Sequence, residues 1–92
     1  MKLRTFTVAP HRYAVEAQAY DGEPIRRTTM ADPASAMSVY VERLDEMDEM
    51  DEMDDPDFVG VVTILRRSGG EWEDVTDWCV RLHREAGKYL YL

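Results

Sequence analysis

Nine carboxylates lie within thirteen consecutive residues near the middle of the chain, in the segment 45–57, which reads DEMDEMDEMDDPD. Clustered carboxylates could bind a divalent cation, attract a basic partner or imitate the charges of a nucleic-acid backbone. The segment contains no basic residue. We call residues 45–57 the acidic run; its acidic members are Asp45, Glu46, Asp48, Glu49, Asp51, Glu52, Asp54, Asp55 and Asp57.

The net charge of the chain, −8, comes from this segment. The chain holds 19 acidic and 11 basic residues, so ten acids and eleven bases remain when the acidic run is set aside. Nucleic-acid-binding proteins need a basic face, and direct binding to nucleic acid is therefore not expected. The charge indicates a basic partner, a cation or a role in solubility.

Cys79 and His83 are the second candidate for chemistry, because residues four apart share one face of a helix. A cysteine nucleophile also needs an orienting third group and an oxyanion site, and the sequence marks neither. We therefore predict that Cys79 is a small buried residue and that the chain is not an enzyme. With His11 there are three soft metal ligands, none at zinc-site spacing, so neither a metal nor a cofactor is predicted.

These residues must be positioned by strands and helices, and strands are expected first. A turn is predicted at 21–24, where Gly22 can adopt a positive φ and Pro24 cannot donate to a ladder. A second turn is predicted at Gly69. Five segments have the β-branched or alternating apolar residues of strands: 3–8, 13–20, 25–30, 58–65 and 71–76.

A long helix is predicted to follow the third strand. Asp32 is a good N-cap, Pro33 suits the first helical position, and the helix must end before Pro56. Its apolar stripe for packing on the sheet consists of Met37, Tyr40, Val41, Leu44 and Met47.

A short helix is predicted near the C-terminus, over 78–86, with Asp77 as its cap and Gly87 at its end. The sequence thus predicts a single α+β domain over 1–92, βββαββα, with both helices on one face of an antiparallel sheet of four to six strands. The predicted core contains Phe6, Val15, Tyr40, Leu44, Val61, Ile64, Leu65 and Trp72.

The acidic run contains three Asp-Glu-Met triplets, whose period of three differs from the helical period of about 3.6. Each methionine is therefore rotated by roughly 60° from the one before it. Met47 is expected in the core, Met50 at its margin and Met53 on the opposite side. The predicted partner-binding residues are the nine carboxylates named above together with Met50 and Met53.

Three interpretations of the acidic run remain open. It could be a solvated helix end, or a cation site, although a calcium loop would need a glycine at its sharp turn. It could also imitate a phosphate backbone, since a helical triplet presents roughly one charge per 2.3 Å and duplex DNA about one per 1.7 Å. The arginine pairs at 26–27 and 66–67 are expected in solvent, or paired with the acidic run.

In size, acidity and architecture the chain resembles the small anti-CRISPR proteins of phages and mobile elements, especially the type I inhibitors that act as DNA mimics. The resemblance rests on the carboxylate cluster DEMDEMDEMDDPD in a short α+β chain with one cysteine. It implies an inhibitor that occupies the basic groove of a CRISPR surveillance complex subunit, and it transfers no individual residue role.

An alternative is a small regulatory or structural accessory module, for example an antitoxin, whose acidic run only serves solubility. The strand–strand–helix opening also resembles small antitoxin domains. No signal peptide or membrane span is recognised in the sequence, so a cytoplasmic location is expected, in the bacterial host if the protein is encoded by a phage. The oligomeric state is left open.

Overall fold

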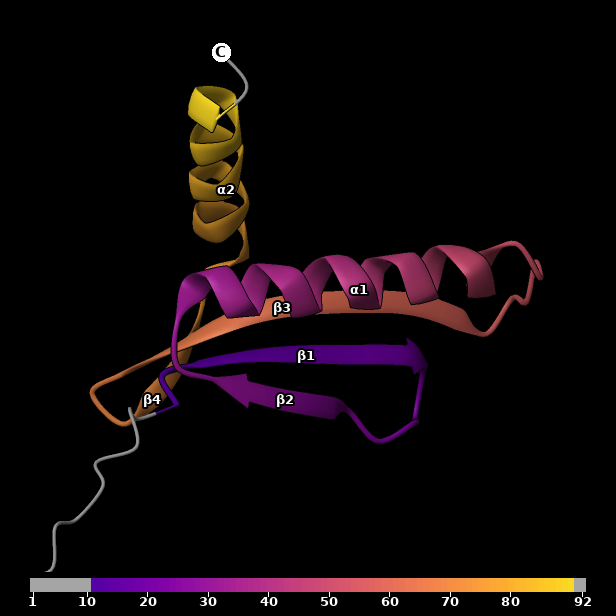
Figure 1. Cartoon of the computed structure of the whole chain (residues 1–92). Helices are drawn as coiled ribbons and strands as arrows, with labels where there is room; N and C mark the ends of the chain where they lie inside the picture. The colour runs from indigo at the N-terminus through magenta and orange to yellow at the C-terminus, as the bar shows by residue number, and fades with distance from the viewer. Residues whose placement is uncertain (1–10, 91–92) are drawn as a thin grey trace, which may run out of the picture.

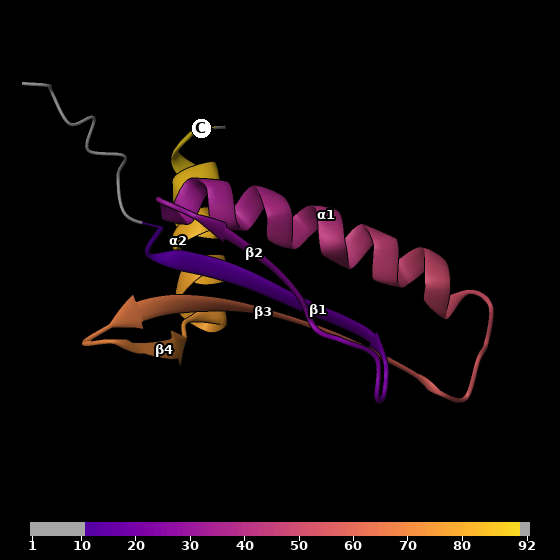
Figure 2. The same ribbon diagram turned by 90° about the horizontal axis from the view of Figure 1, so that it is seen from below.

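Four antiparallel strands form one sheet in the order β2-β1-β3-β4, as the computed structural model shows for residues 11–90, with side chains described for 11–85 (Figures 1 and 2). The α+β prediction is confirmed. The elements are β1 (Tyr13–Tyr20), β2 (Arg26–Met30), α1 (Pro33–Asp51), β3 (Phe58–Ser68), β4 (Glu71–Asp74) and α2 (Thr76–Leu90). The strand predicted at 3–8, with the core residue Phe6, lies outside the described residues.

The alternation of β1 determines which face of the sheet carries the core. Val15, Ala17 and Ala19 are buried on the side of α1, while Glu16 and Gln18 point to the opposite, open face. Both helices lie on the same side of the sheet, and α2 rises from the end of the sheet where β3 and β4 pair (Figure 1). The open face is therefore covered by neither helix.

Helix α1 begins as its sequence predicts. The N–H of Ser35 donates to the Asp32 carboxylate (2.8 Å), and the bonds from Ser35 hold the pKa of Asp32 below its ordinary value. Ala36, Met37 and Met47 are buried against the sheet, with Tyr40 and Leu44 partly buried beside them.

The prediction for Val41 is wrong, because its side chain is 43% exposed. The buried stripe is centred on Ala36, Tyr40 and Met47, and Val41 lies roughly 120° around the helix from that centre. The apolar stripe predicted from the sequence includes Val41 and does not include the small residue Ala36.

Strand β3 contains a bulge at Gly60 that changes which side chains face the core. The pairing with β1 shifts by one residue between Gln18 and Tyr20, and Gly60 has a φ of 58°. Glycine in this left-handed conformation is typical of such a bulge. Beyond the bulge the side chains alternate regularly. Val62 and Ile64 are buried, whereas Val61 pairs with Gln18 and is 49% exposed on the open face, which contradicts its predicted place in the core.

The open face has a small packed cluster of its own at the β4 end. Ala14 is fully buried there although no helix covers it. The Trp72 ring lies between two guanidinium groups, with Arg27 at 5.1 Å and Arg67 at 6.0 Å from its centroid. Arg27 is also held by Glu16 (2.9 Å). Trp72 is therefore half-buried on the open face and does not belong to the predicted core beneath α1.

Helix α2 is separated from β4 by one residue, Val75, and differs from its prediction at both ends. It begins at Thr76, whose N–H donates to the Asp74 carboxylate (3.0 Å), and it continues through Gly87 to Leu90. Among the described residues, no helix combines the length and the apolar character that a membrane crossing requires.

Thr76 joins this helix to the sheet through its hydroxyl group. Its Oγ1 accepts a hydrogen bond from the N–H of the fully buried Ile64 (2.9 Å) and donates to Asp74 Oδ1 (2.7 Å). The bonds from Thr76 lower the pKa of Asp74 below its ordinary value of 3.8. The ionised carboxylate therefore stabilises the fold above that pH, and this contribution is lost as the pH falls through the lowered pKa.

Replacing Thr76 by valine should lower the free energy of unfolding by about 1–3 kcal/mol, since it leaves the Ile64 N–H without its partner. The fall of stability below about pH 4 should also become shallower, because Asp74 loses the bonds that depress its pKa. Urea unfolding at several pH values measures both effects. Thr76→Ser keeps the hydroxyl and is the control; a loss in the valine variant no larger than that in the serine variant would contradict the contribution assigned to the hydrogen bond from the Ile64 N–H.

Candidate partner-binding surface

The acidic run occupies the far end of α1 and the loop that returns to β3. Residues up to Asp51 are helical, and residues 52–57 form the loop. In both ribbon views this end extends past the hairpin between β1 and β2 (Figures 1 and 2). The carboxylates are therefore carried on a part of the molecule that projects beyond the neighbouring strands.

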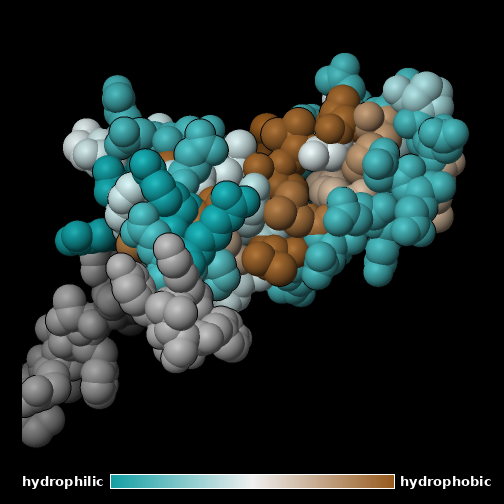
Figure 3. Space-filling model, turned by 90° about the horizontal axis from the view of Figure 1, so that it is seen from above, coloured by the Kyte–Doolittle hydropathy of each residue, from teal (hydrophilic) through white to brown (hydrophobic). Residues whose placement is uncertain are grey.

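Exposure follows the rotation predicted for the triplets. Met47 is buried, Met50 is partly buried at the core margin, and Met53 is 77% exposed. Seen from above, mostly hydrophilic atoms surround this end, with a few apolar ones among them (Figure 3). Eight of the nine carboxylates are exposed: Asp45, Asp48, Glu49, Asp51, Glu52, Asp54, Asp55 and Asp57.

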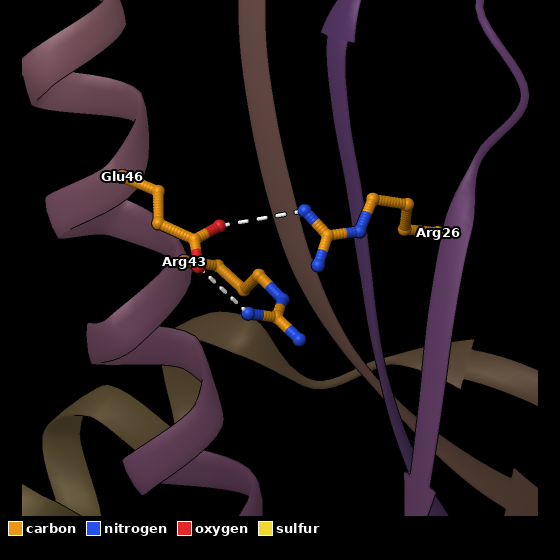
Figure 4. Close-up of polar contacts among 3 residues, drawn as sticks. All are labelled: Arg26, Arg43 and Glu46. Carbon is orange, nitrogen blue, oxygen red and sulfur yellow. Dashed lines mark hydrogen bonds and ion pairs between the residues drawn. The ribbon is translucent and has the colours of Figure 1, made fainter.

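Glu46 is the exception, and it has a structural role. Its two carboxylate oxygens pair with Arg43 one turn earlier on α1 (3.0 Å) and with Arg26 on β2 (3.5 Å) (Figure 4). Within the described residues, no other member of the acidic run forms an ion pair. The predicted pairing of arginines with the run thus occurs at this one carboxylate. We therefore regard Glu46 as a residue that ties α1 to β2 and not as part of the exposed charge.

The chain leaves α1 through a series of backbone turns. The N–H of Met53 donates to the Met50 carbonyl and that of Asp54 to the Asp51 carbonyl, both at 3.1 Å. Asp55 then accepts from the N–H of Asp57 (3.0 Å) with its side chain. The helix ends at Asp51, before Pro56 as predicted. Acidic residues near a helix C-terminus oppose the helix dipole. These turns determine where the loop carboxylates lie.

The loop carboxylates lie beside Asp21, which the sequence does not mark as a partner-binding residue. Asp55 and Asp57 line an open groove of about 570 Å³ together with Asp21 and Tyr20 from the β1–β2 hairpin. The groove forms because Tyr20 pairs with Phe58, which brings the hairpin beside the end of the acidic run. The register between strands that are distant in the sequence cannot be read from neighbouring residues. The sequence around Asp21 therefore does not identify it as a residue of this groove.

The residues considered for catalysis and metal binding lie at the other end of the molecule. Cys79 is 1% exposed, as predicted for a packing residue, and burial raises the pKa of its thiol. Cys79 and His83 line an apolar hollow of about 180 Å³ with Met37 and Leu82. A protonated thiol in these surroundings is a poor nucleophile.

Within the described part of the chain, no three histidine, cysteine or carboxylate side chains converge in a way that could hold a metal ion. The carboxylates of the acidic run point outward from a helix and a loop, and only Asp55 and Asp57 share a groove with another carboxylate, Asp21. The arrangement is suited to contact with a large cationic surface.

Comparison with known proteins supplies no relative for this chain. No protein-family model, no curated protein and no solved structure matches it.

Proposed function

We propose that this protein is a non-enzymatic inhibitor or binding protein that presents an acidic, DNA-mimicking surface to a nucleic-acid-binding partner. The observation that supports the proposal is the set of eight exposed carboxylates, without an ion-pair partner among the described residues, on the projecting end of α1 and its loop. Such a concentration of one charge raises the local potential and attracts a complementary basic surface.

The spacing of the exposed charges supports mimicry of a phosphate backbone. From Asp45 to Glu52 the five exposed carboxylates occur at about one per 2.5 Å of helix rise, against about one per 1.7 Å along duplex DNA. A groove lined with lysine and arginine for phosphates could therefore accept this end of the protein. The match is one of charge density, since the carboxylates surround the helix and do not follow two strands.

The resemblance to small acidic anti-CRISPR proteins suggests the kind of partner. On this proposal the acidic end occupies the DNA-binding groove of a CRISPR surveillance complex subunit and prevents the complex from binding its target DNA. DNA and the protein should then compete for one groove.

Neutralising four charges tests this mechanism. We expect the variant Asp48→Asn, Glu49→Gln, Asp51→Asn and Glu52→Gln to bind about 10-fold to 100-fold more slowly, because electrostatic steering is reduced. Its fold should be at least as stable as that of the wild type, since repulsion between like charges along the helix is relieved. Association rates at several salt concentrations, and gel shifts of a type I surveillance complex on its target DNA, measure the effect.

The matched control removes four exposed charges elsewhere: Glu42→Gln, Glu71→Gln, Asp77→Asn and Glu85→Gln. This control should inhibit like the wild type and retain its salt dependence. The proposal fails if the first variant inhibits as well as the wild type, which would favour a role in solubility. It also fails if DNA and the protein are found on the complex together.

A further inference from the structure

Three apolar side chains are exposed at the end of the sheet that carries the acidic run. Ile25 is 55% exposed, Val59 45% and Val61 49%. Val61 pairs with Gln18 on the open face, and Val59 lies two residues earlier on β3, beyond the bulge at Gly60. We call Ile25, Val59 and Val61 the apolar patch.

The apolar patch continues into the groove beside the loop. Val59 lines that groove with Tyr20, Pro56 and the carboxylates Asp21, Asp55 and Asp57, and no basic residue takes part. A smaller hollow of about 70 Å³ adjoins Ile25 and Val61. Together these two hollows, at one end of the sheet, form a surface that offers three carboxylates, a tyrosine ring and exposed aliphatic side chains.

We propose that this surface binds a cationic segment of a protein partner in which basic side chains are interspersed with aliphatic ones. The inference rests on the proposed function and specifies the chemistry of its partner. Aliphatic groups of the segment would cover the apolar patch, and a lysine or arginine would enter the groove, its stem against Tyr20 and its charge among the three carboxylates.

Other occupants fit this surface less well. A nucleic acid would bring phosphates against Asp21, Asp55 and Asp57, and a second copy of the chain in the same place would bring its own carboxylates there. A purely apolar segment would bury those carboxylates without a counter-charge, which is costly. Charge complementarity therefore selects a cation, and the exposed aliphatic side chains select one with apolar neighbours.

Burial of this surface would add a contribution to the binding affinity that phosphate mimicry alone does not require. Attraction between exposed charges is screened by salt, whereas burial of aliphatic surface is not. Binding through both the acidic run and the apolar patch should thus retain part of its affinity at salt concentrations that abolish purely electrostatic binding.

The test uses two synthetic peptides of ten residues, one that alternates lysine with valine and one in which every valine is serine. Calorimetry with the full chain should give about 10-fold tighter binding of the lysine–valine peptide. NMR should show the methyl groups of Ile25, Val59 and Val61 shifting in that complex. The double variant Ile25→Ser and Val61→Ser should lose this 10-fold preference, and its thermal melt should match the wild type because both side chains are exposed.

A matched pair of charge variants locates the cation. Asp21→Asn, Asp55→Asn and Asp57→Asn should weaken the lysine–valine peptide by about 10-fold, whereas Asp45→Asn, Asp48→Asn and Glu49→Gln should change it less than 3-fold. Equal binding of the two peptides, shifts confined to other methyl groups, or equal losses in the two charge variants would overturn the inference.

The two proposals can fail separately in these measurements. Peptide binding that survives in a protein unable to inhibit the surveillance complex would reject DNA mimicry and keep the groove. Inhibition that survives the loss of peptide binding would reject the groove and keep DNA mimicry.

Discussion

Replacing Ile64 by alanine is expected to lower the free energy of unfolding by about 2–5 kcal/mol, the usual range for removing a large aliphatic side chain from a packed core. Ile64 is 0% exposed and lies on β3 opposite Val15, in the layer between the sheet and α1. The surrounding side chains cannot collapse fully into the space that is left. Urea unfolding followed by circular dichroism measures the loss.

Val61→Ala provides the control within the same strand. Its side chain is 49% exposed on the open face, so we expect a change of less than about 0.5 kcal/mol. A large loss of stability at Val61 together with a small one at Ile64 would mean that the two faces of β3 are exchanged, with Val61 in the core and Ile64 exposed. The bulge at Gly60 would then be misplaced.

Gly60→Ala is expected to cost about 2–4 kcal/mol, because two effects add. The φ of 58° is a left-handed conformation in which a side chain is strained by about 1–2 kcal/mol. A Cβ at this position would also lie 2.6 Å from Cζ of Phe58, so that the ring must move from its edge-on contact with Tyr20. The thermal melt should show a large decrease of the midpoint.

Gly69→Ala separates the two effects. Gly69 has the same φ of 58°, but no atom lies within 4 Å of the position its Cβ would take. It should therefore show only the conformational cost. If the two alanine variants lose equal stability, the Phe58 contact contributes nothing, and the ring is free to move.

The features that the sequence predicted well are determined by neighbouring residues. Asp32 and Pro33 place the start of α1, and Gly22 places the first turn, because capping and turn formation involve groups only a few residues apart. The rotation of Met47, Met50 and Met53 follows from helix geometry alone. The exposure of the acidic run could be anticipated for the same reason.

The features that the sequence did not predict depend on contacts between distant segments. The predicted place of Val61 in the core is wrong, because an uninterrupted apolar run does not show which of its two faces is buried. The ion pair of Glu46 with Arg26 could not be predicted, because it joins α1 to β2 across 20 residues of sequence. The predicted place of Trp72 in the main core is wrong. Its stacking with Arg27 joins side chains from β4 and β2, which the local sequence does not reveal.

The position of the triplets relative to the core has a consequence for how this protein can change over generations. Met47 is the last buried residue of α1, and the following two triplets lie beyond it. Loss or duplication of one Asp-Glu-Met unit would alter the reach by about 4.5 Å of helix. A methionine would still stand at position 50, because every unit ends in one. Tandem repeats vary in whole units, and loop closure depends only weakly on length. Copy number can therefore adjust the exposed charge two carboxylates at a time while the packing beneath α1 stays the same.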